Sequence, residues 1–103
     1  MIDWERVAEL QEEIGEEDFA EIGQVFVEEI QEKLAEITSA PDQNPADFHF
    51  LRGSAANLGL TDFAQACKEA ELSCKSGDTA DTAALVALFE EALAELDGMF
   101  ETA

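Results

Sequence analysis

The only histidine of the chain, His49, stands within the stretch 44–59 and is the side chain best suited to chemistry. Near neutral pH one ring nitrogen of an imidazole carries a free lone pair, so an exposed histidine can accept a phosphoryl group. Arg52 follows one helical turn later and places a cation beside it. The chain has no phosphate-binding glycine loop, no convincing Ser-His-Asp set and too few basic residues for an ATP site. These residues therefore suggest a phosphoryl carrier that lacks the parts of a kinase.

The sequence around His49 carries the signals that bound a helix. An N-cap, a first-turn proline, a capping-box acid and a terminating glycine stand at Asn44, Pro45, Asp47 and Gly59. We expect the helix to run to residue 58, with an apolar stripe made of Phe48, Leu51, Ala55 and Leu58. At about 100° per residue, His49 points about 140° away from the centre of this stripe. The histidine should therefore lie on the outside of the helix.

The outward neighbours of His49 are small with one exception, and they are Pro45, Ala46, Arg52, Gly53 and Ala56. Glycine in a helix interior costs about 1 kcal/mol relative to alanine, so Gly53 suggests that side-chain bulk is unwelcome there. This surface would leave the imidazole open to a large partner. The alternative is that His49 is an ordinary surface histidine or a hydrogen-bonded core residue.

The run His49-Phe50-Leu51-Arg52-Gly53-Ser54-Ala55-Ala56-Asn57-Leu58-Gly59 favours the first interpretation. It resembles the signature of histidine-containing phosphotransfer (HPt) domains, His-x-Leu-Lys/Arg-Gly-Ser/Ala-Ser/Ala-x-x-Leu-Gly, at each fixed position. The opening Ile2-Asp3-Trp4 and the segment 67–71 also look like the family, so the resemblance covers nearly the whole chain. It implies one HPt-like domain spanning residues 1–103.

The resemblance implies a role for five residues. His49 would be phosphorylated on Nε2, Arg52 would offset the phosphoryl charge, and Gly53 would keep the approach clear. Glu71 matches a family position that often carries Gln or Glu, and its carboxylate would bond the other ring nitrogen and fix the tautomer. Lys75, one turn after Glu71, would lie near the phosphoryl group. Glu71 and Lys75 could instead be solvated surface charges.

Three further residues are expected to contact a partner: Phe50, Ala56 and Lys68. An apolar rim around the histidine suits docking, so Phe50 is a candidate contact beside His49. The alternative is that Phe50 completes the edge of the core.

The composition limits the possible partners. At 103 residues and 47% hydrophobic content, the chain is one globular domain with a modest core. Its net charge of −20 disfavours nucleic acid and anionic membrane surfaces. The longest apolar run, residues 83–89, is far shorter than a membrane span, and the first residues resemble no signal or transit peptide. We therefore expect a cytoplasmic protein.

The cysteines point to no special chemistry. Cys67 and Cys74 are seven residues apart on one expected helix, so their Cα atoms would be about 10.5 Å apart, beyond disulfide reach. With a single histidine, a zinc site is improbable, and we expect no metal ligands. Both cysteines are expected to be small core residues in a reducing compartment.

The remaining helices are expected to flank the histidine helix. Asp3 should cap a short first helix that ends near Gly15 and buries one side made of Trp4, Val7 and Ile14. A second helix, 16–38, should bury Phe19, Ile22, Phe26, Ile30, Leu34 and Ile37.

After the histidine helix, Thr61 should cap a helix over 62–76 that buries Phe63, Cys67, Ala70 and Cys74. Asp78 and Asp81 should open the last helix, whose stripe is Val86, Phe89, Leu93, Leu96 and Phe100. The predicted fold is all-α, an antiparallel up-down four-helix bundle with a short additional N-terminal helix.

As a functional expectation, the family resemblance implies a phosphorelay intermediate. It would take a phosphoryl group from the receiver domain of a response regulator or of a hybrid histidine kinase, and pass it to another receiver. It would be a monomer without cofactors, and Mg²⁺ would belong to the receiver. One alternative is the phosphoacceptor domain of a chemotaxis-type histidine kinase, against which the chain's end at Ala103 argues. Another is a non-catalytic helical adaptor, in which the histidine would commonly be lost.

Overall fold

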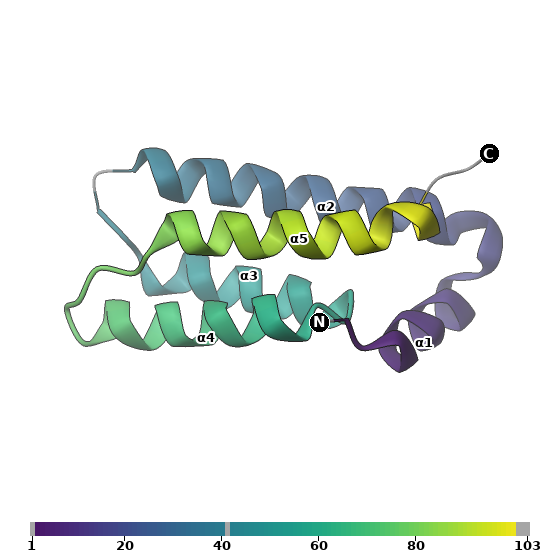
Figure 1. The fold of residues 1–103 in the computed structure, drawn as a ribbon, viewed down its shortest axis with the longest axis horizontal. Helices are drawn as coiled ribbons and strands as arrows, with labels where there is room; N and C mark the ends of the chain where they lie inside the picture. Colours follow the sequence, from purple (N-terminus) through teal and green to yellow (C-terminus); the bar gives the residue numbers. More distant parts are fainter. Residues whose placement is uncertain (1, 41, 101–103) are drawn as a thin grey trace.

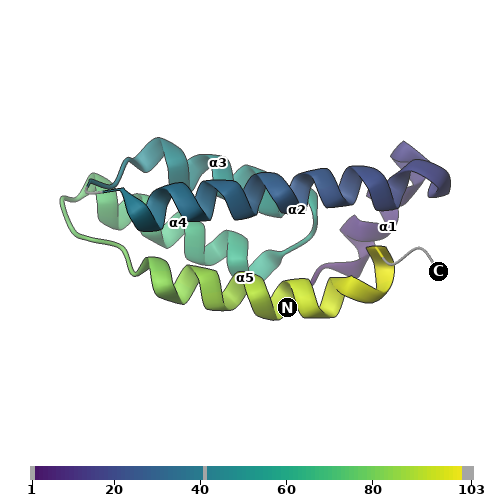
Figure 2. The same cartoon turned by 90° about the horizontal axis from the view of Figure 1, so that it is seen from above.

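Five helices make up the protein in the computed structural model, which describes residues 2–40 and 42–100, with side chains up to residue 96. They are α1 (Trp4–Ile14), α2 (Glu16–Ser39), α3 (Pro45–Asn57), α4 (Thr61–Lys75) and α5 (Thr82–Phe100). Helices α2 to α5 run up and down beside one another along a body of 43 × 22 × 19 Å, and α1 lies at one end (Figures 1 and 2). The predicted all-α four-helix bundle with an additional N-terminal helix is confirmed.

The predicted signals around α3 act as expected at both of its ends. The Asn44 side chain accepts a hydrogen bond from the backbone N–H of Ala46 at 3.0 Å, and Pro45 is the first helical residue. Gly59 ends the helix in the left-handed region with φ +75°. Asp47 was predicted to be a capping-box acid, but its carboxylate instead lies 3.5 Å from Lys33 Nζ on α2.

The turn between α3 and α4 also holds the N-terminus in place. The backbone N–H of Asp3 donates to Gly59 O at 2.7 Å, and Ile2 forms an isolated antiparallel bridge with Leu60. A Cβ atom at Gly59 would lie 2.7 Å from Asp3 O, so no larger residue fits there without displacing the backbone. The close approach therefore fixes the start of α1 against this turn.

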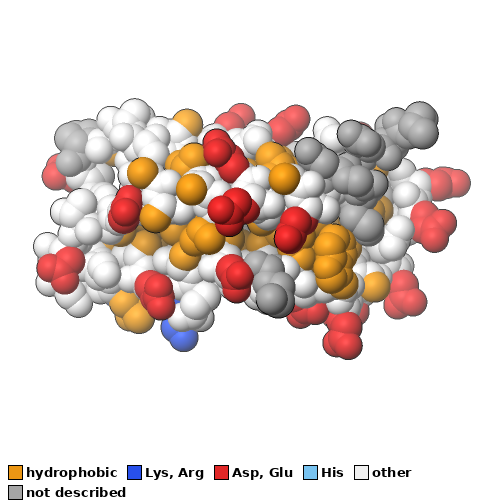
Figure 3. All heavy atoms as spheres, in the orientation of Figure 1, with side chains coloured by type: hydrophobic (Ala, Val, Ile, Leu, Met, Phe, Trp, Pro, Cys, Tyr) orange, Lys and Arg blue, Asp and Glu red, His pale blue; other side chains and the backbone are white. Residues whose placement is uncertain are grey.

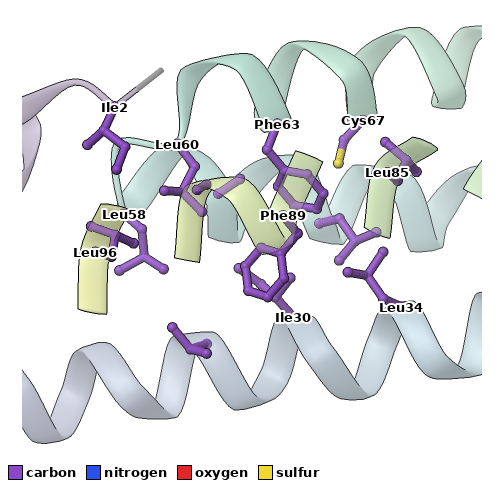
Figure 4. Close-up of a cluster of buried hydrophobic side chains, with 14 of the residues drawn as sticks. Ile2, Ile30, Leu34, Leu58, Leu60, Phe63, Cys67, Leu85, Phe89 and Leu96 are labelled. Atoms are coloured by element: carbon purple, nitrogen blue, oxygen red, sulfur yellow. The ribbon is translucent and has the colours of Figure 1, made fainter. Parts of the chain in front are cut away.

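The core contains the whole predicted stripe of α3. Phe48, Leu51, Ala55 and Leu58 are at most 1% exposed. Side chains from the other helices close around them, and Phe63 of α4 meets Phe89 of α5 with ring centroids 5.3 Å apart (Figure 4). Because this face of α3 is filled with apolar side chains, the opposite face is directed to the surface.

Several details of the flanking helices differ from the expectation. In α1 the buried residues are Val7 and Leu10, while Trp4 is half exposed. In α2 the expected Ile22 is exposed, and Gly23 and Val27 occupy the buried face. The buried positions are thus displaced by one residue in the middle of α2, where Phe26 is only partly buried, whereas Phe19, Ile30, Leu34 and Ile37 are buried as predicted.

The last two helices begin at other residues than expected. Helix α4 begins at Thr61 with Leu60 as its N-cap. Helix α5 begins at Thr82, and Asp81 caps it by accepting a hydrogen bond from Ala84 N–H at 3.1 Å. The core face of α5 contains Leu85 and Ala92 in addition to Phe89 and Leu96, whereas Val86 and Leu93 are partly buried. Phe100 lies outside the residues with described side chains.

Residues 78–80, which were expected to belong to α5, form a loop that is held by a distant side chain. The Gln43 amide donates to Ala80 O at 2.9 Å and accepts from Ala80 N–H at 2.8 Å. These two bonds keep the chain before Asp81 out of a helix.

Acidic side chains dominate the surface. On the face shown in Figure 3 they surround a band of hydrophobic side chains that runs along the helices. No helix within the described residues is both long and apolar enough to cross a bilayer. The acids follow the outward faces of the amphipathic helices, as expected for solvated charge.

Candidate functional site

His49 lies on the outer face of α3, and its side chain is 63% exposed. Its neighbours Phe48 and Leu51 are fully buried. The same helical geometry that directs those residues inward holds the imidazole outward. The structure thus excludes a core position for His49.

Both polar contacts of the imidazole, within the described part of the chain, use Nδ1. Arg52 Nη2 lies 3.2 Å from Nδ1, and Glu71 Oε2 lies 3.4 Å from the same atom. Arg52 comes from the next turn of α3, whereas Glu71 comes from α4. The pairing of α3 with α4 therefore engages one ring nitrogen and leaves the other, Nε2, for an external reactant.

Glu71 is buried, although Glu69 and Leu72 on either side of it in α4 are exposed. Lys75 Nζ lies 3.2 Å from its Oε2, and Arg52 Nη1 lies 3.6 Å from its Oε1. One carboxylate thus joins His49, Arg52 and Lys75 in a single cluster. The interpretation of Glu71 as a solvated surface acid is wrong.

The cluster also keeps Glu71 ionised. Burial by itself would raise the pKa of the carboxyl group, but the hydrogen bond and charge of Lys75, with the charges of Arg52 and His49, outweigh burial and lower it. An ionised carboxylate can only accept hydrogen bonds. Glu71 can therefore accept a hydrogen bond from a donor such as Nδ1–H.

Comparison with known proteins agrees with this geometry. The family model described as "Hpt domain" matches residues 21–99, which include all of α3 and α4. The chain belongs to the Hpt domain family. Neither the curated proteins nor the solved structures gave a significant match. Hpt domains carry phosphoryl groups in phosphorelays and are not themselves catalysts. They interact with receiver domains and kinases.

The surface beside His49 in this Hpt domain is open, as the small residues suggested. A Cβ atom added to Gly53 would meet nothing within 4 Å, and both Gly53 and Ala56 are exposed. Gly53 has no packing requirement for glycine in this structure. Any side chain there would extend into the space next to the imidazole.

Phe50 lies at the edge of this surface and is 41% exposed. Lys33 of α2 lies over its ring, with Nζ 5.4 Å from the centroid, and is also paired with Glu36 at 2.9 Å. The structure therefore adds Lys33 to the rim of the site. No periodicity in the sequence identifies it, because the contact depends on how α2 packs beside α3.

A groove of about 400 Å³ adjoins the site between α1 and the α3–α4 turn of the Hpt domain. Its wall contains Ala56 and Gly59, with three cations and three acids, which are Arg6, Arg52, Lys68, Asp3, Glu5 and Glu9. Arg6 is far from His49 in sequence, and it reaches the groove because the start of α1 is held against the α3–α4 turn. All five basic residues are thus connected to the surroundings of His49: three in the groove, Lys33 at Phe50 and Lys75 at Glu71.

The site shows no metal-ligand set. Among the described residues, no group of three or more His, Cys, Asp or Glu side chains is placed to hold a metal ion. The two cysteines are both free. Cys67 is buried, and the half-buried Cys74 donates from Sγ to Gln43 O at 3.4 Å.

Proposed function

We propose that His49 accepts a phosphoryl group on Nε2 from the aspartate of one receiver domain and passes it to the aspartate of another. One observation carries the proposal: an exposed mid-helix imidazole is held through Nδ1 alone, beside a buried and ionised carboxylate. This arrangement orients the ring and leaves Nε2 toward the open surface at Gly53 and Ala56.

The chemistry requires little from this chain. The lone pair of Nε2 attacks phosphorus and forms the N–P bond, while the P–O bond to the donor aspartate breaks and its electron pair stays on the released carboxylate. Nδ1 carries the imidazole proton and donates it as a hydrogen bond to Glu71, which stabilises the positive charge that develops on the ring. Transfer to the second receiver is the reverse of these steps.

Arg52 and Lys75 supply charge to the bound phosphoryl group. Both lie beside Glu71, at 3.6 and 3.2 Å, and this carboxylate also contacts the imidazole, so both cations belong to the cluster that would meet an anion at Nε2. We propose that Mg²⁺ and the remaining carboxylates come from the receiver, since phosphoryl transfer relies mainly on positioning and charge stabilisation.

The receiver would dock over the surface formed by Phe50, Ala56 and Lys68, with the adjoining groove. Arg52 and Lys68 supply the positive charge that an anionic phosphorylated receiver site would meet there, while Asp3, Glu5 and Glu9 line the groove on the side of α1. We propose a monomer acting in the cytoplasm, which engages one receiver at a time because both reactions use the same imidazole.

The test is transfer from phosphorylated receivers of the same cell to the purified protein. The expected product is an acid-labile, base-stable phosphoprotein, formed by the wild type and absent in His49→Gln. A label that remains in His49→Gln would refute the assignment of the residue. Phosphorylation by an ATP-dependent kinase domain, and by no receiver, would replace the proposed donor with the chemotaxis-type alternative.

A further inference from the structure

Two groups with opposite requirements face His49 Nδ1. Arg52 Nη2 lies 3.2 Å from it and Glu71 Oε2 lies 3.4 Å from it. A guanidinium group can only donate hydrogen bonds, and an ionised carboxylate can only accept them. Neutral imidazole carries one proton, so Nδ1 can satisfy only one of the two neighbours at a time.

The neighbour that Nδ1 pairs with determines whether the other ring nitrogen, Nε2, is protonated. When Arg52 donates to Nδ1, the ring proton resides on Nε2, which then has no lone pair and cannot attack phosphorus. When Nδ1–H donates to Glu71, Nε2 is unprotonated and nucleophilic. In the structure the Arg52 contact is the shorter one and has hydrogen-bond geometry. As a hydrogen bond, this contact corresponds to the unreactive tautomer, because only the guanidinium can donate in it.

We propose that Arg52 is a positioning residue that controls the tautomer of His49 and holds Nε2 unreactive until an anionic phosphoryl group draws the guanidinium away. This inference rests on the proposed function, since it concerns the same imidazole. On release of Arg52, Nε2 loses its proton to water and Nδ1 takes one from water. Nδ1–H then donates to Glu71, and the net proton count of the ring is unchanged.

The surroundings of Arg52 suit such a movement. Its side chain is 36% exposed, and its second contact, Nη1 to Glu71 Oε1, is 3.6 Å long. A phosphoryl group offers charged oxygens, which bind a guanidinium more strongly than a neutral ring nitrogen does. Lys75 lies 3.2 Å from Glu71 Oε2, the same oxygen that faces Nδ1, and a carboxylate oxygen can accept a hydrogen bond from each of them. The carboxylate therefore stays in place while the arginine moves.

The experiment is long-range ¹H–¹⁵N NMR of the imidazole in the protein without phosphate or receiver, at about pH 9, well above the pKa of about 6.5 of a free imidazole. His49 is the only histidine, so a single ring gives the signals. The wild type should show mainly the Nε2–H tautomer. Arg52→Met should change the tautomer ratio about fivefold toward Nδ1–H, which corresponds to about 1 kcal/mol, the net worth of one hydrogen bond.

Arg6→Met is the matched control, because it removes the same charge from the same groove and its ion pairs are with Glu9 and Glu13. It should leave the tautomer ratio of the wild type unchanged. The proposal is overturned by a wild type that is already mainly Nδ1–H, by an Arg52→Met ratio within about twofold of wild type, or by an equal change in Arg6→Met. These spectra need no phosphoryl transfer, so they remain informative even if the proposed receiver function fails.

Discussion

Replacing Gly53 with alanine is expected to stabilise the protein. The position is in the interior of α3 and exposed, and an added Cβ atom meets nothing within 4 Å. Only the difference in helix propensity remains, which favours alanine by about 1 kcal/mol. For a domain of this size, that free energy corresponds to an increase in melting temperature of roughly 4–8 °C.

The assay is thermal unfolding followed by circular dichroism, with Gly59→Ala as the matched control. Gly59 has φ +75°, and its Cβ atom would lie 2.7 Å from Asp3 O. The same substitution should therefore cost about 2 kcal/mol or more there, through backbone strain and displacement of the start of α1. Opposite signs at the two glycines are the expected result.

A larger residue at Gly53 separates stability from transfer. Gly53→Gln should fold like Gly53→Ala, because its side chain enters open space. Its length places it beside the imidazole one turn away, where it obstructs a receiver, so transfer should be slower than in Gly53→Ala. A melting temperature below wild type in Gly53→Ala, or unimpaired transfer by Gly53→Gln, would refute the reasoning.

Adjacent residues Phe50 and Leu51 should separate docking from stability. Leu51→Ala should lower the unfolding free energy by about 2–5 kcal/mol, because Leu51 is fully buried. Phe50→Ala should change the unfolding free energy by no more than about 1 kcal/mol but should slow phosphoryl transfer. Equal losses of unfolding free energy in the two variants, measured by urea unfolding, would contradict this prediction. The pKa of Glu71 in the folded protein lies below its ordinary value of 4.5. Ionised Glu71 therefore stabilises the folded protein above pH 4.5, and this contribution is lost as the pH falls through the folded pKa. The stability difference between wild type and Glu71→Gln should therefore narrow below pH 4.5, and a pH-independent difference would argue against the cluster. Burial raises the pKa of Cys67 to about 12, so a thiol reagent at neutral pH should label Cys74 in the native protein and Cys67 only in urea. Equal labelling of the two in the native state would disagree with the packing of α4.

The sequence was sufficient for α3 because its signals are local. An N-cap, a first-turn proline and a stripe of Phe48, Leu51, Ala55 and Leu58 determine both the helix and its buried face, and the outward position of His49 follows by geometry. The position of Glu71 was inferred from family resemblance alone. Its burial depends on how α4 packs against α3, which the periodicity of either helix does not specify.

The errors occurred where distant parts of the chain decide the local structure. Asp78 and Asp81 are both good capping residues, and the Gln43 bonds to Ala80 select the later one. Arg6 and Lys33 could not be connected with the site from the sequence, because they are far from His49 along the chain. The packing of α1 against the α3–α4 turn and of α2 beside Phe50 brings them to its surroundings.

The most direct test of the proposed function is to identify the atom that receives the phosphoryl group. The protein, labelled with ¹⁵N and phosphorylated by a receiver, would be analysed by NMR for phosphorus–nitrogen coupling in its single imidazole. The proposed function predicts phosphorus on Nε2 of His49, with Nδ1 protonated and facing Glu71. Phosphorus on Nδ1, on a carboxylate, or on no residue after exposure to competent receivers would contradict it.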